Sequence, residues 1–148
     1  GVPADVVEAA RALAQASGQT GCKLTLKMPC YLPVMQFAHS AALRETLYRA
    51  YTTRASDQAA PEHVKFDNSA IMQSLLALRQ EEADLLGYAN FAQVSLVPKM
   101  AQSPEQVASF LRDLAAKARP YAEQDLADMR AFAAEHLGLS DPQAWDWP

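Results

Sequence analysis

A long helical pattern in the second half of the sequence constrains the fold of this chain more than any other feature. Ser103-Pro104-Glu105-Gln106 combines an N-cap residue, a first-turn proline, an acid and the S-x-x-Q capping box. Apolar residues then recur at helical spacing before Gly138, at Val107, Phe110, Leu111, Leu114, Ala118, Tyr121, Leu126, Met129, Phe132 and Ala133. The pattern predicts one long helix, with a kink near Ala116 to Pro120 because Pro120 removes a backbone hydrogen bond.

Helical signals also dominate the rest of the chain. The predicted helices run from Pro3 to about Ser17 with a stop at Gly18, from a cap at Ser40 to Arg54, and from a cap at Asp67, Asn68 or Ser69 to a stop at Gly87. Pro29 and Pro33 predict a tight connection around residues 31–35, and residues 58–63 predict an exposed loop.

One segment has a different period. Residues 22–28 alternate apolar and polar side chains, which predicts a short β-strand. No second segment offers an equally good pairing partner, so we expect the partner to lie outside this chain. The predicted fold class is therefore mainly α, a multi-helix bundle-like single domain over residues 1–148 with one short β-strand.

Composition excludes several classes of function. The chain has 148 residues, half of them hydrophobic, which suits one core. Its 17 acidic and 13 basic residues are scattered, so we expect no nucleic-acid partner. No apolar run approaches the roughly 20 residues that cross a bilayer, so we expect no membrane partner. Two cysteines are too few for a disulfide scaffold, which favours a cytoplasmic location.

No catalytic centre is recognisable in the sequence. Zinc catalysis needs three protein ligands and an open position, commonly with two histidines one helical turn apart. His39, His63 and His136 lie far apart, and we interpret them as solvated or capping residues. Cys22 and Cys30 are interpreted as structural thiols. We therefore assign no catalytic, cofactor-binding or metal-binding residue to this chain.

Other polar and aromatic residues are also candidates for a functional role. Glu123, Asp125, Asp128 and Glu135 include no Glu-x-x-His pair and are interpreted as a solvated helix face. The aromatic residues either line a peptide groove or pack in the core: Tyr48, Tyr51, Tyr88 and Phe91. Arg49 and Arg54 either meet a peptide carboxylate or are ordinary surface cations, with Glu45 one turn before Arg49.

Several stretches together resemble the oligopeptidase A branch of the thimet oligopeptidase family of zinc metallopeptidases. They are residues 24–26 and 31–35, Tyr48 to Asp57, Asp67-Asn68-Ser69, Leu85 to Ala92, Lys99-Met100-Ala101, Arg119-Pro120 and Trp145-Asp146. Their order resembles the region that precedes the family's His-Glu-x-x-His helix, and no residue here matches that motif. Gly1-Val2-Pro3 resembles an internal start, and Trp147-Pro148 departs from the family's pair of tyrosines, so we expect a truncated chain.

The resemblance implies a mainly helical parent that encloses a channel and cleaves short peptides in the cytoplasm with one zinc ion. It implies that this chain is scaffold and channel wall, is inactive alone, and has the remainder of the parent as its partner. An exposed apolar patch is then expected, covered by the parent or by a second copy in a homodimer. The alternative is a stand-alone helical module that binds a partner protein or peptide.

Overall fold

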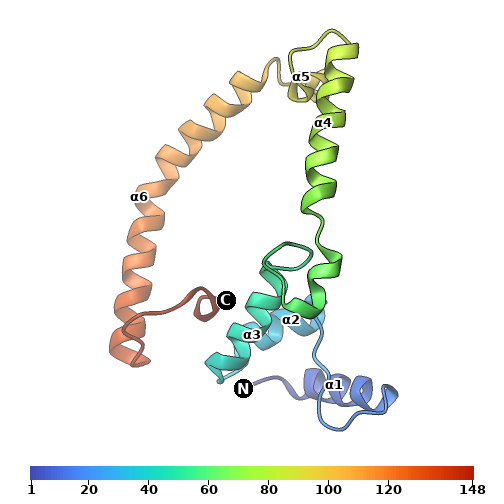
Figure 1. Ribbon diagram of the computed structural model, residues 1–148. Helices are drawn as coiled ribbons and strands as arrows, with labels where there is room; N and C mark the ends of the chain where they lie inside the picture. Colours follow the sequence, from blue (N-terminus) through green and yellow to red (C-terminus); the bar gives the residue numbers. More distant parts are fainter. The chain divides into compact units, whose positions relative to one another are not determined.

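The structure is a computed structural model that describes residues 1–148, and it is mainly helical, which confirms the mainly α part of the predicted class (Figure 1). It contains two compact units. Unit 1 comprises residues 1–67 and 141–148, and unit 2 comprises residues 68–140. The single domain expected over residues 1–148 stays a prediction, and each unit is described by itself. No helix combines the length and the apolar composition that crossing a bilayer requires.

Unit 1 is built around α2. Its elements are α1 (Ala4–Ala16), α2 (Met28–Phe37), α3 (Ala41–Thr52) and the 3₁₀ helices η1 (Pro61–Phe66) and η2 (Ala144–Asp146). Helix α2 packs against α1 and α3, and η2 packs against α3. The core of this unit consists of Tyr31, Val34, Met35, Ala38 and Leu47. Residues from both ends of the sequence, Val2 and Trp145, pack against that core.

The predicted strand at residues 22–28 is wrong. Residues 22–25 are irregular, and α2 already begins at Met28. The backbone N–H of Lys23 donates to the Ala10 carbonyl of α1 at 2.9 Å, and that of Thr25 donates to Cys30 Sγ at 3.3 Å. The alternation in the sequence places Leu24 and Leu26 against the core, as it would in a strand. Backbone groups that bond to α1 and to a side chain do not need a β-ladder.

The tight connection predicted around residues 31–35 is a helix of ten residues, α2. Pro29 lies in its first turn, where a missing N–H costs no intrahelical bond. Pro33 lies inside the helix, and an interior proline costs about 3 kcal/mol. The adjacent Val34 and Met35 are almost completely buried, and their burial offsets that cost.

The caps predicted at Ser40 and Ser103 and the stop at Gly87 are confirmed, whereas Asn68, the N-cap of α4, makes no side-chain capping bond. Ser40 Oγ accepts from the Leu43 N–H at 3.3 Å at the start of α3, and Ser103 Oγ accepts from the Gln106 N–H at 3.1 Å at the start of α6. The Gln106 side chain reaches back to the N–H of Gln102, one residue before the N-cap, at 2.7 Å. Gly87 takes φ 79° just after α4, in the left-handed region that favours glycine at a helix end.

Unit 2 contains α4 (Ser69–Leu85), α5 (Phe91–Leu96) and α6 (Pro104–His136). Short α5 packs against both long helices. Helix α6 continues through Pro120, and Figure 1 shows that its two halves do not share one straight axis. The position of the bend near Ala116 to Pro120 stays a prediction.

Unit 2 buries very little of its apolar surface. Only Ala83 and Ala133 are buried in it. One face of α4 is exposed along a line of four apolar residues, which we call the α4 stripe: Ile71, Leu75, Leu78 and Leu85. One face of α6 is exposed in the same way, which we call the α6 stripe: Phe110, Leu114, Tyr121 and Phe132. Leu85 is 88% exposed and Tyr121 is 75% exposed, far outside the usual environment of such side chains in a core.

Candidate functional site

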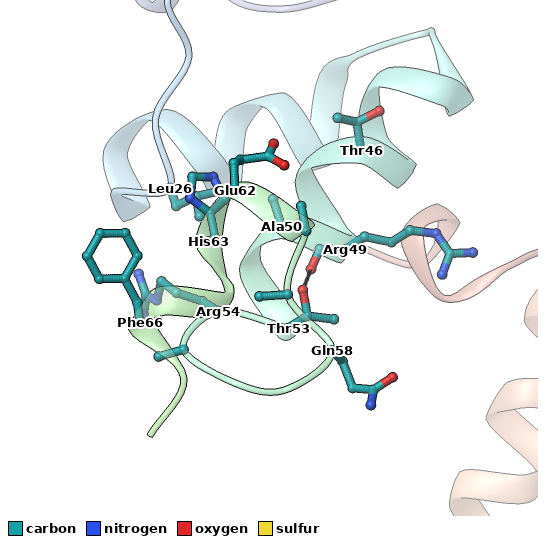
Figure 2. A pocket seen from close by; sticks show the side chains of 13 residues that line it. Leu26, Thr46, Arg49, Ala50, Thr53, Arg54, Gln58, Glu62, His63 and Phe66 are labelled. Atoms are coloured by element: carbon teal, nitrogen blue, oxygen red, sulfur yellow. Dashed lines mark hydrogen bonds between the residues drawn. The ribbon is translucent and has the colours of Figure 1, made fainter. Parts of the chain in front are cut away.

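A pocket of about 880 Å³ in unit 1 is the candidate site. It lies between the C-terminal half of α3, the loop that follows α3, and η1 (Figure 2). Its volume falls in the range of sites that hold small ligands. Leu26, Ala50 and Phe66 supply apolar lining, and Arg49, Arg54, Glu62 and His63 supply charged or titratable groups.

The loop wall of this pocket is held by hydroxyl hydrogen bonds. Thr53 Oγ1 donates to the Arg49 carbonyl at 2.8 Å, a bond drawn in Figure 2. Ser56 Oγ donates to the Thr53 carbonyl at 2.7 Å and accepts from the Gln58 N–H at 3.2 Å. Between them, Ala55 has φ 57°, the one positive φ outside glycine in the chain. A left-handed alanine costs roughly 1–2 kcal/mol, so the loop is held in a defined, strained turn.

The two arginines of the pocket differ in how their charge is balanced. Arg49 Nε donates to Glu45 Oε1 at 2.8 Å, and its guanidinium lies 5.1 Å from the centre of the Trp145 ring. Arg54 forms no ion pair, and its guanidinium lies 5.2 Å from the centre of the Tyr51 ring. Figure 2 shows them on opposite sides of the pocket, with Arg54 on the side of Phe66. Arg54 is therefore the cation that remains available to an anion.

Tyr51 of α3 forms an aromatic pair with Tyr31 of α2. The Tyr31 and Tyr51 rings stack with centroids 4.3 Å apart, which adds to the stabilisation from burial alone. Burial raises the pKa of the Tyr31 hydroxyl, and the neighbouring hydroxyls of Tyr51 and Tyr48 raise it further. The peptide-groove candidates Tyr48 and Tyr51 are thus core-packing residues of unit 1.

A second polar cluster fixes the last residues of unit 1 to α3. The Arg44 guanidinium donates to the Ala38 carbonyl, to the Trp145 carbonyl and to Asp146 Oδ1. Burial acts to raise the pKa of Asp146, but the hydrogen bonds from Arg44 and from the Gln143 N–H, together with the Arg44 charge, lower it overall. Sequence reasoning did not identify Arg44, because its partners lie up to 102 residues away and no local pattern marks them.

Apart from His63, which lines the pocket, the other candidate residues do not gather into a site. His39 lies after α2 and His63 lies in η1, whereas His136 lies at the end of α6, with its ring 4.6 Å from that of Phe132. Cys22 and Cys30 are free thiols. The acidic residues of α6 include Glu123, paired with Arg119 at 2.7 Å, and Asp128, which accepts from Gln124 at 2.8 Å. Tyr88 and Phe91 belong to unit 2, where Arg79 lies over the Phe91 ring at 4.9 Å.

The donor groups of this chain do not fit a zinc ion. No three side chains among His, Cys, Asp and Glu lie close enough together to hold a metal. Zinc in a catalytic site requires three such ligands around one point. We therefore assign no step of metal chemistry to these residues.

Comparison with known proteins places the chain in a family. The model of peptidase family M3 matches residues 34–148. Oligopeptidase A of Salmonella typhimurium is 52% identical over 146 residues, and that of Escherichia coli is 51% identical over 146 residues. Each match covers 99% of this chain and 21% of the relative, so the chain spans about a fifth of their length. An organellar oligopeptidase A of Arabidopsis thaliana is 46% identical over 124 residues, which are 84% of this chain and 15% of the relative. The chain belongs to peptidase family M3.

Proposed function

We propose that this chain is a scaffold and channel-wall segment of a zinc-dependent oligopeptidase that hydrolyses short peptides. The proposal rests on the α4 and α6 stripes, taken together with membership of peptidase family M3. Large apolar side chains exposed in regular lines mark surfaces that another polypeptide covers. In the relatives, about four-fifths of the length lies outside the match, which is ample chain to cover both stripes.

The residues of this chain indicate which roles it would have in such an enzyme and which roles another segment would have. Its residues form helices, caps and packing contacts, and no three of its side chains form a metal site. The zinc ion of the parent would supply the electrophile and the activated water from another segment. The helices of this chain would orient the peptide backbone and restrict the channel to short or unfolded substrates. The isolated chain is therefore expected to be inactive.

The partners follow from the same proposal. The remainder of the parent peptidase covers the stripes, and short peptides are the substrates of the complete enzyme. The cytoplasm is the proposed location, as expected for an enzyme of peptide turnover. The stand-alone interaction module is the alternative, and it requires that the stripes bind a separate protein.

A chimera of a relative tests the proposal. In Escherichia coli oligopeptidase A, the segment that matches this chain is replaced by this chain, and hydrolysis of a short fluorogenic peptide is measured. We expect the chimera to be active and the 148-residue chain alone to be inactive. Replacing Leu75 and Leu78 of the α4 stripe by glutamate places two charges in the proposed interface. That double variant should lose most of the chimera's activity and lower its melting temperature.

The matched control substitutes Gln73 and Ala77 by glutamate. Both are exposed residues of α4 at helical positions opposite the stripe, so the added charge is the same. This control should retain activity. If the two double variants behaved alike, the α4 stripe would not be an interface with the remainder of the enzyme. Chelator-sensitive hydrolysis by the chain alone would contradict its predicted inactivity.

A further inference from the structure

The pocket in unit 1 has a chemistry that the scaffold role does not require. It combines an apolar lining with one cation that no acid neutralises. Structural roles account for Arg44 and Arg49, because each pairs with an acid and contacts other residues of unit 1. Arg54 has no such bond, and its guanidinium contacts the Tyr51 ring instead.

The geometry points to a site for the C terminus of a short peptide: we propose that the Arg54 guanidinium binds the terminal carboxylate and that the apolar lining takes the last side chain. This inference rests on the proposed function, because it names the end of the peptide that this segment would hold. Arginine suits the role because its planar fork pairs with both oxygens of a carboxylate.

The Tyr51 ring positions the Arg54 guanidinium before a ligand binds. Tyr51 is itself held by its stack on Tyr31, a buried residue of the unit 1 core. A guanidinium held over a ring loses less rotamer freedom on binding than one that is free in solvent. The chain on both sides of Arg54 is held by the Thr53 and Ser56 hydroxyl bonds and by the left-handed turn at Ala55.

The apolar lining lies on the same side as the cation. Figure 2 shows Phe66 beside Arg54, with Leu26 next to His63 above them. Phe66 is 58% exposed, so its ring is available for contact with a ligand. Glu62 also lines the pocket and forms no ion pair with either arginine. An apolar C-terminal residue such as leucine matches this combination, and an acidic side chain in the last position is disfavoured by Glu62.

The probe for this site is N-acetyl-alanyl-leucine with a free C terminus, titrated into the isotope-labelled 148-residue chain and followed by NMR chemical shifts. A ligand of this size is expected to bind with Kd of about 0.1–1 mM. We expect shift changes at residues 49–66, and binding at least about tenfold weaker for the C-terminal amide, which lacks the charge. A third probe, N-acetyl-glutamyl-leucine amide, carries its carboxylate on a side chain and separates a terminal carboxylate from an acidic residue of a covering segment.

The variants Arg54→Gln and Arg54→Lys test the assigned partner, with Arg112→Gln on α6 as the matched control. Arg54→Gln should bind the acid no better than the amide, Arg54→Lys should retain part of the preference, and Arg112→Gln should bind like the original chain. Equal binding of acid and amide by the original chain, or an unchanged preference in Arg54→Gln, would overturn the proposal. Preference for the side-chain carboxylate probe would also overturn it. Since the chimera test concerns α4 of unit 2, the two proposals can fail independently.

Discussion

Arg44 of α3 joins the end of α2 to Trp145 and Asp146, which lie 101 and 102 residues further along the chain. Its guanidinium bonds to the end of α2, to the Trp145 carbonyl and to the Asp146 carboxylate, and the Arg44 and Asp146 side chains are only 14% and 7% exposed. A charge pair at this depth is strongly destabilising when one partner is removed, because the other charge is left without compensation. The link between α3 and residues 141–148 therefore depends on both charges.

We expect Asp146→Asn to lower the free energy of unfolding of unit 1 by about 2–4 kcal/mol at pH 7. The pKa of Asp146 is lowered in the folded state, so its stabilisation is complete above the unfolded pKa of about 3.9 and is lost as the pH falls through the folded pKa. The difference between the variant and the original chain should therefore shrink at pH 3. Denaturant titration followed by tryptophan fluorescence measures it, because Trp145 and Trp147 both lie in unit 1.

Glu123→Gln is the control for this experiment, because the Glu123 and Arg119 side chains are mostly exposed. An exposed pair of this kind contributes at most about 0.5 kcal/mol. A stability difference for Asp146→Asn that stayed constant between pH 7 and pH 3 would show that the charge of Asp146 does not contribute as described.

At the scale of single elements, a side-chain cap at Ser103 fixes where the long helix α6 begins. The Ser103 hydroxyl accepts a hydrogen bond from the N–H of Gln106. The pKa of the Glu105 carboxylate is lowered mainly by a hydrogen bond from its own backbone N–H, and further by one from the Ser103 hydroxyl. A helix whose N-cap is lost leaves one more N–H group without a partner in its first turn. The start of α6 should therefore be sensitive to this one residue.

We expect Ser103→Ala to destabilise the first turn of α6 by about 1 kcal/mol. Amide hydrogen exchange at residues 105–108 measures this change as faster exchange by a factor of about five. Ser74→Ala is the control, since the Ser74 hydroxyl donates to the Ala70 carbonyl within α4 and caps no helix end. If both substitutions left exchange unchanged, the capping bond of Ser103 would not hold the helix start.

The elements that the sequence predicted correctly are those with local signals. The Ser40 and Ser103 caps and the Gly87 stop each act within a few residues, so pattern and structure agree. Helix α5 was missed, although Asn90 caps it by accepting from the Gln93 N–H at 3.1 Å, because a six-residue helix has too few positions for a period to show. The strand at residues 22–28 was predicted wrongly because alternation does not specify what the backbone pairs with.

The candidate site was predictable only in part, for the same physical reason. Arg49 and Arg54 were identified from the sequence as cations that either meet a peptide carboxylate or are ordinary surface residues, with Glu45 one turn before Arg49. The structure shows that Arg49 pairs with Glu45 and that Arg54 does not pair with an acid. The pocket itself depends on η1, whose first three residues lie in the segment 58–63 that was predicted as an exposed loop, and on the left-handed turn at Ala55. Pro61 and Glu62 are local signals for the start of η1 that apolar periodicity does not capture, whereas the turn at Ala55 has no such signal.

For the molecule as a whole, the α6 stripe predicts self-association of the isolated chain. Exposed apolar lines of this length bind one another in water when no other partner covers them. We expect the chain to shift from monomer to dimer with rising concentration in sedimentation velocity experiments. Replacing Phe110 and Leu114 by glutamate should keep it monomeric with an unchanged helix content in circular dichroism.

Ala115 and Ala116 are the matched control positions, because both are exposed and lie on the side of α6 that faces away from Phe110 and Leu114. Replacing these two alanines by glutamate adds the same charge and should leave the dimer intact. A chain that stayed monomeric at all concentrations would contradict the expectation of a homodimer, although the proposed interface with the parent enzyme would be unaffected.

Unit 1 is built from two separate stretches of the sequence, residues 1–67 and 141–148, and this has a consequence for synthesis on the ribosome. The Asp146 carboxylate that binds Arg44 is translated 102 residues later. At 5–20 residues per second, that interval lasts about 5–20 s, during which all of unit 2 is translated. The nascent unit 1 spends this time without the segment that closes it over α3. A pause or a rare codon between these two residues would therefore prolong the period in which the growing chain is open to proteolysis.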